Sequence, residues 1–148
     1  MARPAAVVSE LELRLVVPGG APLPVVAGLR YEPHDPYAVH VGFHTGSSPD
    51  APDDEVVEWT FARQLLTDGV TRDVGDGDVQ VWPSQSAGRP VVCLALSSPS
   101  GRALFEVPLT ALVEFLTRTY AAVPTGSESD HVDLDAELAL LLWAEPEL

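Results

Sequence analysis

The sequence predicts a single α+β domain. Apolar and polar residues alternate along several short segments in the first two-thirds of the chain, which is typical of half-buried strands. In the last third, the apolar residues recur at the spacing of an α-helix. A chain of 148 residues has the length of one ordinary domain, and its hydrophobic fraction of 46% is enough to form a core. Strands followed by helices, rather than alternating with them, indicate the α+β class.

The first three predicted strands cover residues 10–17, 25–31 and 38–44. In the first, leucines alternate with charged residues in the run E-L-E-L-R-L, so one face is apolar and the other charged. Gly28 weakens the second strand, and we expect a bulge there. The proline-rich turn 33–36 separates it from the third strand, which alternates again.

The middle of the chain is predicted to combine strands with one short helix. Residues 46–54 lack apolar periodicity and are expected to form a loop before a strand at 55–61. A short helix at 62–68 then ends at Gly69, which we expect to act as its C-terminal stop. The sequence Gly-Asp-Gly at 75–77 predicts a hairpin between strands at 70–74 and 78–82.

The last strands precede two helices. The run 91–96 is apolar at every position, so we expect both of its faces to be covered, and an alternating strand follows at 102–107. Pro108 then suits the first turn of a helix that ends before Pro124. After a polar linker, Asp133 can cap a second helix with a leucine stripe.

The charge of the chain argues against two classes of partner. The formal net charge is −14, from 22 acidic residues against 8 arginines. Nucleic acids and anionic membranes repel a domain this acidic unless its few arginines gather in one patch. The single cysteine excludes an internal disulfide and a cysteine-based zinc site. Neither a targeting signal nor an apolar run long enough to cross a bilayer is found, so we expect a cytoplasmic protein without direct membrane insertion.

No catalytic motif stands out. The sequence contains no nucleophile elbow, phosphate-binding P-loop, dinucleotide fingerprint or zinc-protease motif. The glycines at 75–77 lie between strands without a following helix, so we interpret them as a turn rather than a phosphate site. We therefore predict a non-enzyme that needs no cofactor.

Three weaker candidates for chemistry have simpler explanations. His40 and His44 share one face of a strand, but at a rise of 3.3 Å per residue they lie about 13 Å apart, too far to share a metal ion easily. Cys93 lies in an apolar run, which predicts a buried thiol with a raised pKa. The acidic run 53–55 lacks the alternating ligands and glycine turn of a calcium site, so we predict a solvated loop and no metal site.

Exposed aromatic and arginine side chains are candidates for contact with a partner. Trp82 lies on the strand face opposite Val79 and Val81, so we expect it to be partly exposed. We add Tyr37 and Arg63 as further candidates for a partner interface.

Several blocks of sequence resemble the SsgA-like proteins, the sporulation-specific cell-division regulators of filamentous actinobacteria. The resemblance covers nearly the whole chain and places a single domain at 1–148 with its core at about 10–143. The matching blocks are L-E-L-R-L-V-V (11–17), L-P-V-V-A-G-L-R-Y (23–31), D-P-Y-A-V-H-V-G-F-H-T-G (35–46), V-E-W-T-F-A-R-Q-L-L (57–66), G-D-V-Q-V-W-P-S (77–84), V-V-C-L-A-L-S-S-P-S-G (91–101) and V-D-L-D-A-E-L (132–138).

This resemblance implies a fold, an assembly and a role. The fold would be two packed antiparallel sheets of about eight short strands with C-terminal helices, similar to the Whirly proteins that bind single-stranded nucleic acids. The assembly would be a homotrimer. Among the family's branches, the chain is most similar to the one that helps to place the tubulin-like GTPase FtsZ at future septum sites, together with an SsgA-type paralogue.

Three hypotheses for function remain open at this point, and the third, an enzyme, is supported only by the pair His40 and His44 and by the acidic loop. The first is a non-enzymatic adaptor that recruits or positions FtsZ during sporulation-specific division. The second is a single-stranded nucleic-acid-binding protein, as a Whirly-like fold would suggest, although the net charge of −14 argues against it. Residues 47–54 form an acidic insertion relative to the family pattern, which could alter contacts with a partner.

Overall fold

The structure, a computed structural model, describes residues 5–44 and 56–131. In chain order its elements are β1 (Val7–Leu15), β2 (Leu23–Tyr31), β3 (Ala38–His44), β4 (Val56–Ala62), α1 (Arg63–Gly69), β5 (Val74–Asp76), β6 (Val79–Ser86), β7 (Arg89–Ser98), β8 (Gly101–Pro108), α2 (Leu109–Ala122) and the 3₁₀ turn η1 (Glu128–His131). The order of strands, short helix, strands and longer helix confirms the predicted α+β arrangement. The predicted loop 46–54 and the second helix predicted from Asp133 lie outside the described residues.

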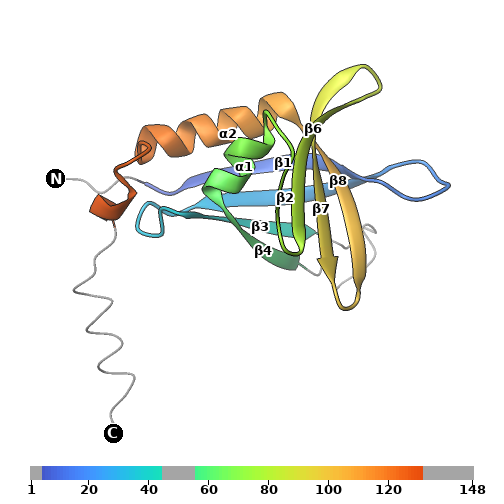
Figure 1. Cartoon of the computed structure of the whole chain (residues 1–148), viewed down its shortest axis with the longest axis horizontal. Coiled ribbons are helices and arrows are strands. Elements are labelled where there is room, and N and C mark those ends of the chain that lie inside the picture. The colour runs from blue at the N-terminus through green and yellow to red at the C-terminus, as the bar shows by residue number, and fades with distance from the viewer. Residues whose placement is uncertain (1–4, 45–55, 132–148) are drawn as a thin grey trace, which may run out of the picture.

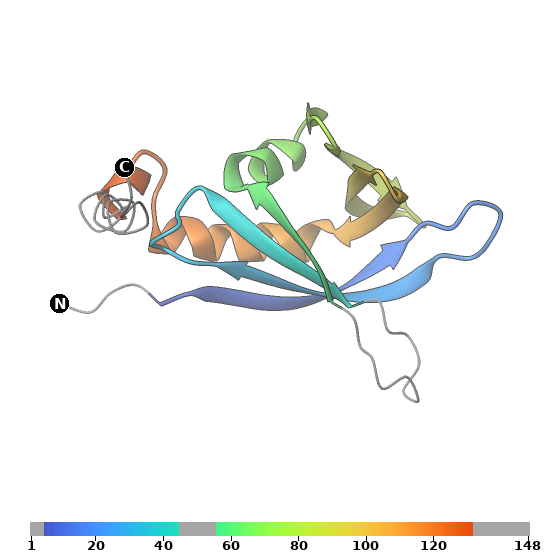
Figure 2. The ribbon, with the colours of Figure 1, turned by 90° about the horizontal axis from the view of Figure 1, so that it is seen from below.

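The described strands form one curled antiparallel sheet (Figures 1 and 2). Their order is β4-β3-β2-β1-β8-β7-β6-β5. The resemblance implied two separate sheets, and the structure differs because β1 and β8 join the two four-stranded halves. This joint is narrow, with only Arg14 opposite Glu106 and Leu15 opposite Phe105. A short ladder lets the halves bend toward each other, so their inner faces enclose a common core.

Both helices lie on the concave side of the sheet (Figure 2). Leu66 of α1 and Leu112 of α2 belong to the same buried cluster as the inward side chains of both halves. Across the joint, the rings of Phe43 and Phe105 stack with their centroids 4.6 Å apart. The core therefore lies between the two halves of one sheet, with the helices closing part of the opening.

Two glycines play roles other than those predicted. Glu10 pairs directly with Gly28 in an uninterrupted ladder between β1 and β2, so the predicted bulge is wrong. Gly69 is the last residue of α1 and is buried, and it does not have the positive φ of a glycine that stops a helix. A side chain at Gly69 would place its Cβ 2.7 Å from the Cβ of Val81, so close packing of α1 on β6, and not helix termination, requires glycine there.

The hairpin predicted around residues 75–77 is confirmed, although its strands are displaced. Val74 pairs with Val81, and Asp76 pairs with Val79. Beyond β5, β6 continues through Pro83 to Ser86, which the sequence pattern did not predict. The N–H of Ser97 donates to the carbonyl of Asp78, so the even-numbered residues of β6 direct their backbone groups toward β7. The backbone nitrogen of Pro83 therefore points away from β7. Proline therefore removes no bond of this ladder.

Candidate functional site

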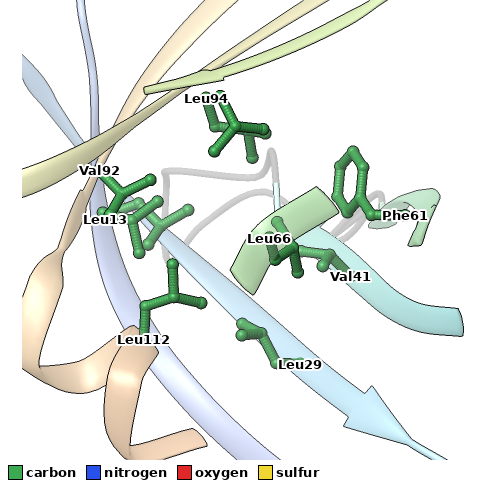
Figure 3. Close-up of a pocket in the computed structure, with 10 residues that line it drawn as sticks. Leu13, Leu29, Val41, Phe61, Leu66, Val92, Leu94 and Leu112 are labelled. Carbon is green, nitrogen blue, oxygen red and sulfur yellow. The ribbon is translucent and has the colours of Figure 1, made fainter. Parts of the chain in front are cut away.

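A small cavity lies in the core between the two halves of the sheet (Figure 3). Its volume is about 20 Å³, and its lining consists entirely of hydrocarbon side chains. Leu13, Leu66, Leu94 and Leu112 enter it from a strand of each half and from both helices. A space of this size holds about one water molecule and offers it no polar partner, so we interpret the cavity as a gap in core packing.

A larger groove opens at the other end of the concave side. Its volume is about 320 Å³, and it extends from β4 across β3 and β1 to the β7–β8 hairpin. Phe43, Phe105 and Trp59 supply aromatic surface, and Arg102 is the charged residue of its lining. A concave apolar surface with few polar groups is the usual form of a site that binds an apolar segment or molecule.

Strand β4 forms one wall of this groove and is also an edge of the sheet. Val57 and Trp59 line the groove, and Val57 remains 44% exposed. Val56, on the other face of the strand, is exposed as well. Among the described residues, β3 is the only strand that pairs with β4. The edge and the groove lie side by side, so a partner at this end of the sheet could contact both.

Arg63 does not lie on the surface, so the expectation that it is exposed is wrong. Its side chain is only 2% exposed and lies between two aromatic rings. The guanidinium carbon is 4.9 Å from the ring centre of Tyr31 and 3.9 Å from that of Tyr120. Burial raises the pKa of Tyr31 to about 12, while the nearby Arg63 cation acts in the opposite direction.

The same guanidinium caps the C-terminus of α2. Its Nη1 atom donates to the carbonyl oxygens of Thr119 and Val123 at 3.1 and 2.9 Å. Its Nη2 atom donates to Oε2 of Glu128 at 2.9 Å, which fixes turn η1 against the helix end. These partners lie 56 to 65 residues away in sequence, so no local pattern could have identified the buried role of Arg63.

His40 is part of a hydrogen-bonded row on the convex face. Its two ring nitrogens lie 3.1 Å from Oγ1 of Thr60 and from Oδ2 of Asp35. These contacts explain its position without a ligand. Within the described part of the chain, no group of three or more histidine, cysteine or acidic side chains could hold a metal ion.

Trp82 and Cys93 are opposite each other on neighbouring strands, with Glu106 beyond Cys93 on β8. Trp82 is half-buried, as its position opposite the inward-facing Val79 and Val81 predicts. Cys93 is buried, but it does not belong to the core cluster. Burial, reinforced by the Glu106 carboxylate, raises its pKa, as predicted, so the thiol is a poor nucleophile. Both faces of β7 are thus covered, the outer one by neighbouring side chains.

The remaining candidate residues are dispersed. Tyr37 is 57% exposed and lies directly before β3 in one half of the sheet, whereas Trp82 lies on β6 in the other half. Arg30 pairs with Glu32, and Arg72 pairs with Asp68. Partner contact by Tyr37 and Trp82 remains a prediction.

Sequence reasoning missed the groove and the free edge. The groove forms only when β4 and the β7–β8 hairpin, some 40 residues apart in sequence, face each other across the curl. The free edge at β4, however, could have been predicted from its sequence. The segment Val56–Ala62 is rich in β-branched and aromatic residues and contains one charge and no proline, which is typical of a strand able to pair on both sides.

In the part of the chain that the structure describes, no helix combines the length and apolar character needed to span a membrane.

Comparisons with known proteins identify a family over most of the chain. A family described as Streptomyces sporulation and cell division protein, SsgA, matches residues 25–128. A protein of Frankia casuarinae described as sporulation-specific cell division protein SsgB is 65% identical over 141 residues, which cover 95% of this chain and 94% of that protein. The protein of the same description from Streptomyces coelicolor is 59% identical over 133 residues, covering 90% and 93% of the two chains.

Solved structures extend the comparison to the fold. The crystal structure of an SsgA-like sporulation-specific cell division protein from Thermobifida fusca is 48% identical, with a TM-score of 0.82 over 96% of this chain and 99% of that one. A second structure comes from work on SsgB mutations that correlate to longitudinal cell division during sporulation of Streptomyces coelicolor. It is 56% identical, with a TM-score of 0.80 over 88% of this chain and 98% of that one.

Proposed function

Because this chain belongs to the SsgA family of sporulation and cell division proteins, we propose that it is a non-enzymatic adaptor in sporulation-specific cell division. In this role it recruits or positions the tubulin-like GTPase FtsZ at septum sites. The SsgA-like sequence blocks imply FtsZ as the partner, and the mechanism is protein–protein contact.

One observation carries the proposal. The alignment with the Frankia casuarinae protein covers 95% of this chain and 94% of that one, so the two share an entire domain rather than a module. Relatives described as sporulation-specific cell division proteins therefore match the chain as a whole. The largely apolar groove beside β4 supports a binding role, since its lining combines hydrocarbon and aromatic side chains with one guanidinium and two serines.

The proposal includes an assembly and a location. The chain forms a homotrimer, works with an SsgA-type paralogue, and lies in the cytoplasm at septum sites. Its bent sheet is related to the two packed sheets of Whirly proteins, with the narrow β1–β8 joint as the point where the two layers meet. Three copies on one polymer would raise avidity through multivalency. Sedimentation velocity tests the trimer, because a species of one chain mass, 15.8 kDa, would contradict it.

Co-sedimentation with FtsZ polymers tests direct recruitment. We expect the protein to enter the pellet with FtsZ assembled in GTP and to stay in the supernatant with FtsZ in GDP. Tyr37→Ala tests the exposed aromatic candidate and Trp82→Ala the half-buried one, and Val113→Ala on α2 is a control at another exposed apolar residue. Absence of the wild-type protein from the GTP pellet at low salt would contradict direct binding.

Fluorescent tagging tests recruitment in sporulating cells. Foci that form a ladder before FtsZ rings assemble would support recruitment. A uniform signal through septation, or foci that appear only after the rings, would contradict it.

A further inference from the structure

The two edges of the sheet are protected to different degrees. β5 has three residues, Val74–Asp76, and one of them is Gly75, so it offers little backbone for pairing. β4 has seven residues, no proline and a single charge, Glu58. Proteins usually protect sheet edges by shortness, proline, charge or bulges. By these criteria β5 is protected and β4 is open to another strand.

The backbone of β4 presents a defined set of free groups. The N–H of Arg63 donates to the carbonyl of Tyr37 at 2.8 Å, in register with the β3–β4 ladder. In an antiparallel pair, alternate residues direct both backbone groups toward the partner strand. Val57, Trp59 and Phe61 therefore bond β3. The intervening Val56, Glu58 and Thr60 direct their N–H and C=O groups toward the free side.

The side chains of β4 define what an added strand would meet. Val57 and Trp59 lie on the concave face and line the groove of about 320 Å³. Glu58 points to the convex face and is exposed. A strand beside β4 continues the sheet, so its side chains next to Val57 and Trp59 would enter the groove. The side chain opposite Glu58 would lie beside the carboxylate on the convex face.

We propose that β4 binds an extended segment of a partner protein by antiparallel strand addition, and that this segment has a basic residue between two apolar residues. The basic residue lies opposite Glu58, and its backbone exchanges both hydrogen bonds with Glu58. The two apolar side chains fill the groove beside Val57 and Trp59. Main-chain bonds supply affinity and the alternating side chains supply specificity, as in other complexes formed by strand addition. The inference rests on the proposed function only in requiring a protein partner.

Charge favours a basic partner segment over a second copy of this chain. On the convex face, the register places Glu10, Gly28, Gly42 and Glu58 in one row across four strands, so both ends of the row carry a carboxylate. Two copies paired through β4 would bring two chains of net charge −14 together at this face. Opposite charges across strands are stabilising, and like charges are not.

Peptide binding tests the backbone and charge requirements separately. The probes are fluorescein-labelled heptapeptides with valine-arginine-valine or valine-glutamate-valine at the centre, measured by fluorescence anisotropy with the full chain. We expect the arginine peptide to bind at least about threefold more tightly than the glutamate peptide. N-methylation of the central arginine keeps its charge but removes the N–H that strand addition requires, so binding should be lost. Equal binding of the methylated and unmethylated peptides would overturn the proposal.

Variants of Glu58 locate the binding site. Glu58→Lys should reverse the preference in favour of the glutamate peptide. The matched control, Glu10→Lys, makes the same change in net charge three strands away and should keep the preference for arginine. Equal effects of the two variants would show attraction to the whole acidic chain and would overturn the proposal.

A proline variant tests the edge directly. Glu58→Pro removes an N–H that does not bond β3, so the sheet should remain folded by circular dichroism while arginine-peptide binding is lost. If Glu58→Pro instead dissociates an assembly in sedimentation velocity, the edge joins copies of this chain and the proposal is wrong. Because the probes contain no FtsZ, peptide binding without FtsZ co-sedimentation would contradict the proposed function alone. FtsZ co-sedimentation that is unchanged in Glu58→Pro would contradict this inference alone.

Discussion

The guanidinium of Arg63 holds three segments together. Arg63 is the first residue of α1, and its guanidinium lies between the rings of Tyr31 and Tyr120. The guanidinium donates hydrogen bonds to the end of α2 and to Glu128 in η1. A cation at a helix C-terminus also interacts favourably with the helix dipole. The planar group can stack and donate in several directions at once, which a lysine ammonium cannot do in the same way.

We expect Arg63→Ala to lower the free energy of unfolding by about 3 kcal/mol, because it leaves buried carbonyl groups and a carboxylate without their donor. The stability of Arg63→Lys should fall between that of the wild type and that of Arg63→Ala, since lysine keeps the charge but lacks the planar guanidinium with its several N–H donors. Urea denaturation at pH 7 measures both variants. An Arg63→Ala transition at the wild-type midpoint would show that the cluster contributes nothing to stability.

Glu128 should make stability depend on pH in the acidic range. Hydrogen bonds from its own backbone N–H and from that of Gly126, with Arg63 nearby, hold the pKa of this carboxyl below its ordinary value of 4.5. The unfolded chain therefore takes up this proton more readily than the folded one. The resulting stabilisation is complete above pH 4.5 and is lost as the pH falls through the lowered pKa.

Glu128→Gln tests this dependence by removing the titrating group. Between about pH 5 and about pH 3, wild-type stability should fall more steeply than that of the variant in urea denaturation. Parallel curves for the two proteins would exclude a contribution from Glu128.

At the level of elements, the position of α1 depends on its close packing against β6. Glycine in a helix costs up to about 1 kcal/mol relative to alanine, so helix propensity alone favours Gly69→Ala at the last residue of α1. The Cβ of alanine would lie 2.7 Å from the Cβ of Val81, and such overpacking typically costs about 1–3 kcal/mol. Packing therefore outweighs propensity.

We predict that Gly69→Ala lowers the melting temperature despite its gain in helix propensity. In a double-mutant cycle, Gly69→Ala should cost less in a Val81→Ala background, because the Cγ1 methyl group of Val81, the atom nearest to the added Cβ, is absent and only the Cβ contact remains. Additive effects in thermal denaturation would contradict a contact between the two residues.

The β6–β7 hairpin contains an unfavourable residue at its turn. Ala87 and Gly88 separate the paired residues Ser86 and Arg89, and both have positive φ, 51° and 78°. A two-residue turn with positive φ at both positions favours asparagine or glycine at the first. Ala87→Gly should raise the free energy of unfolding by about 0.5–1 kcal/mol. Gly88→Ala serves as the opposite control and should destabilise, and a destabilised Ala87→Gly would count against this turn geometry.

Most elements could be predicted from sequence because their signals are local. Alternation located β1, β3 and β8, and helical spacing located α2. The extension of β6 through Pro83 was missed because proline is unusual within a strand. Whether proline is tolerated depends on which side of the strand has a neighbour, and that is a property of the assembled sheet.

At the level of the whole molecule, charge separates the two functions considered for this fold. Among the described arginines, Arg63 is buried, and Arg30 and Arg72 pair with acidic side chains. Three of the seven described arginines are therefore already buried or paired, in a chain whose net charge is −14. Phosphate binding requires several free cations in one place.

We expect labelled single-stranded oligonucleotides to show no micromolar binding in anisotropy measurements at about 50 mM salt. A basic protein with a known oligonucleotide site is the positive control. Micromolar binding that weakens steeply with added salt would revive the nucleic-acid hypothesis.

The sequence by itself determined the class of the domain, most of its elements, its excess of negative charge and the family to which it belongs. These properties follow from composition and from patterns with periods of a few residues. The tertiary structure alone decided that the described strands form one bent sheet, that Arg63 is a buried cap, and that an open edge adjoins an apolar groove. Each of these depends on contacts between residues far apart in sequence, which form only when the curl of the sheet brings its two halves together.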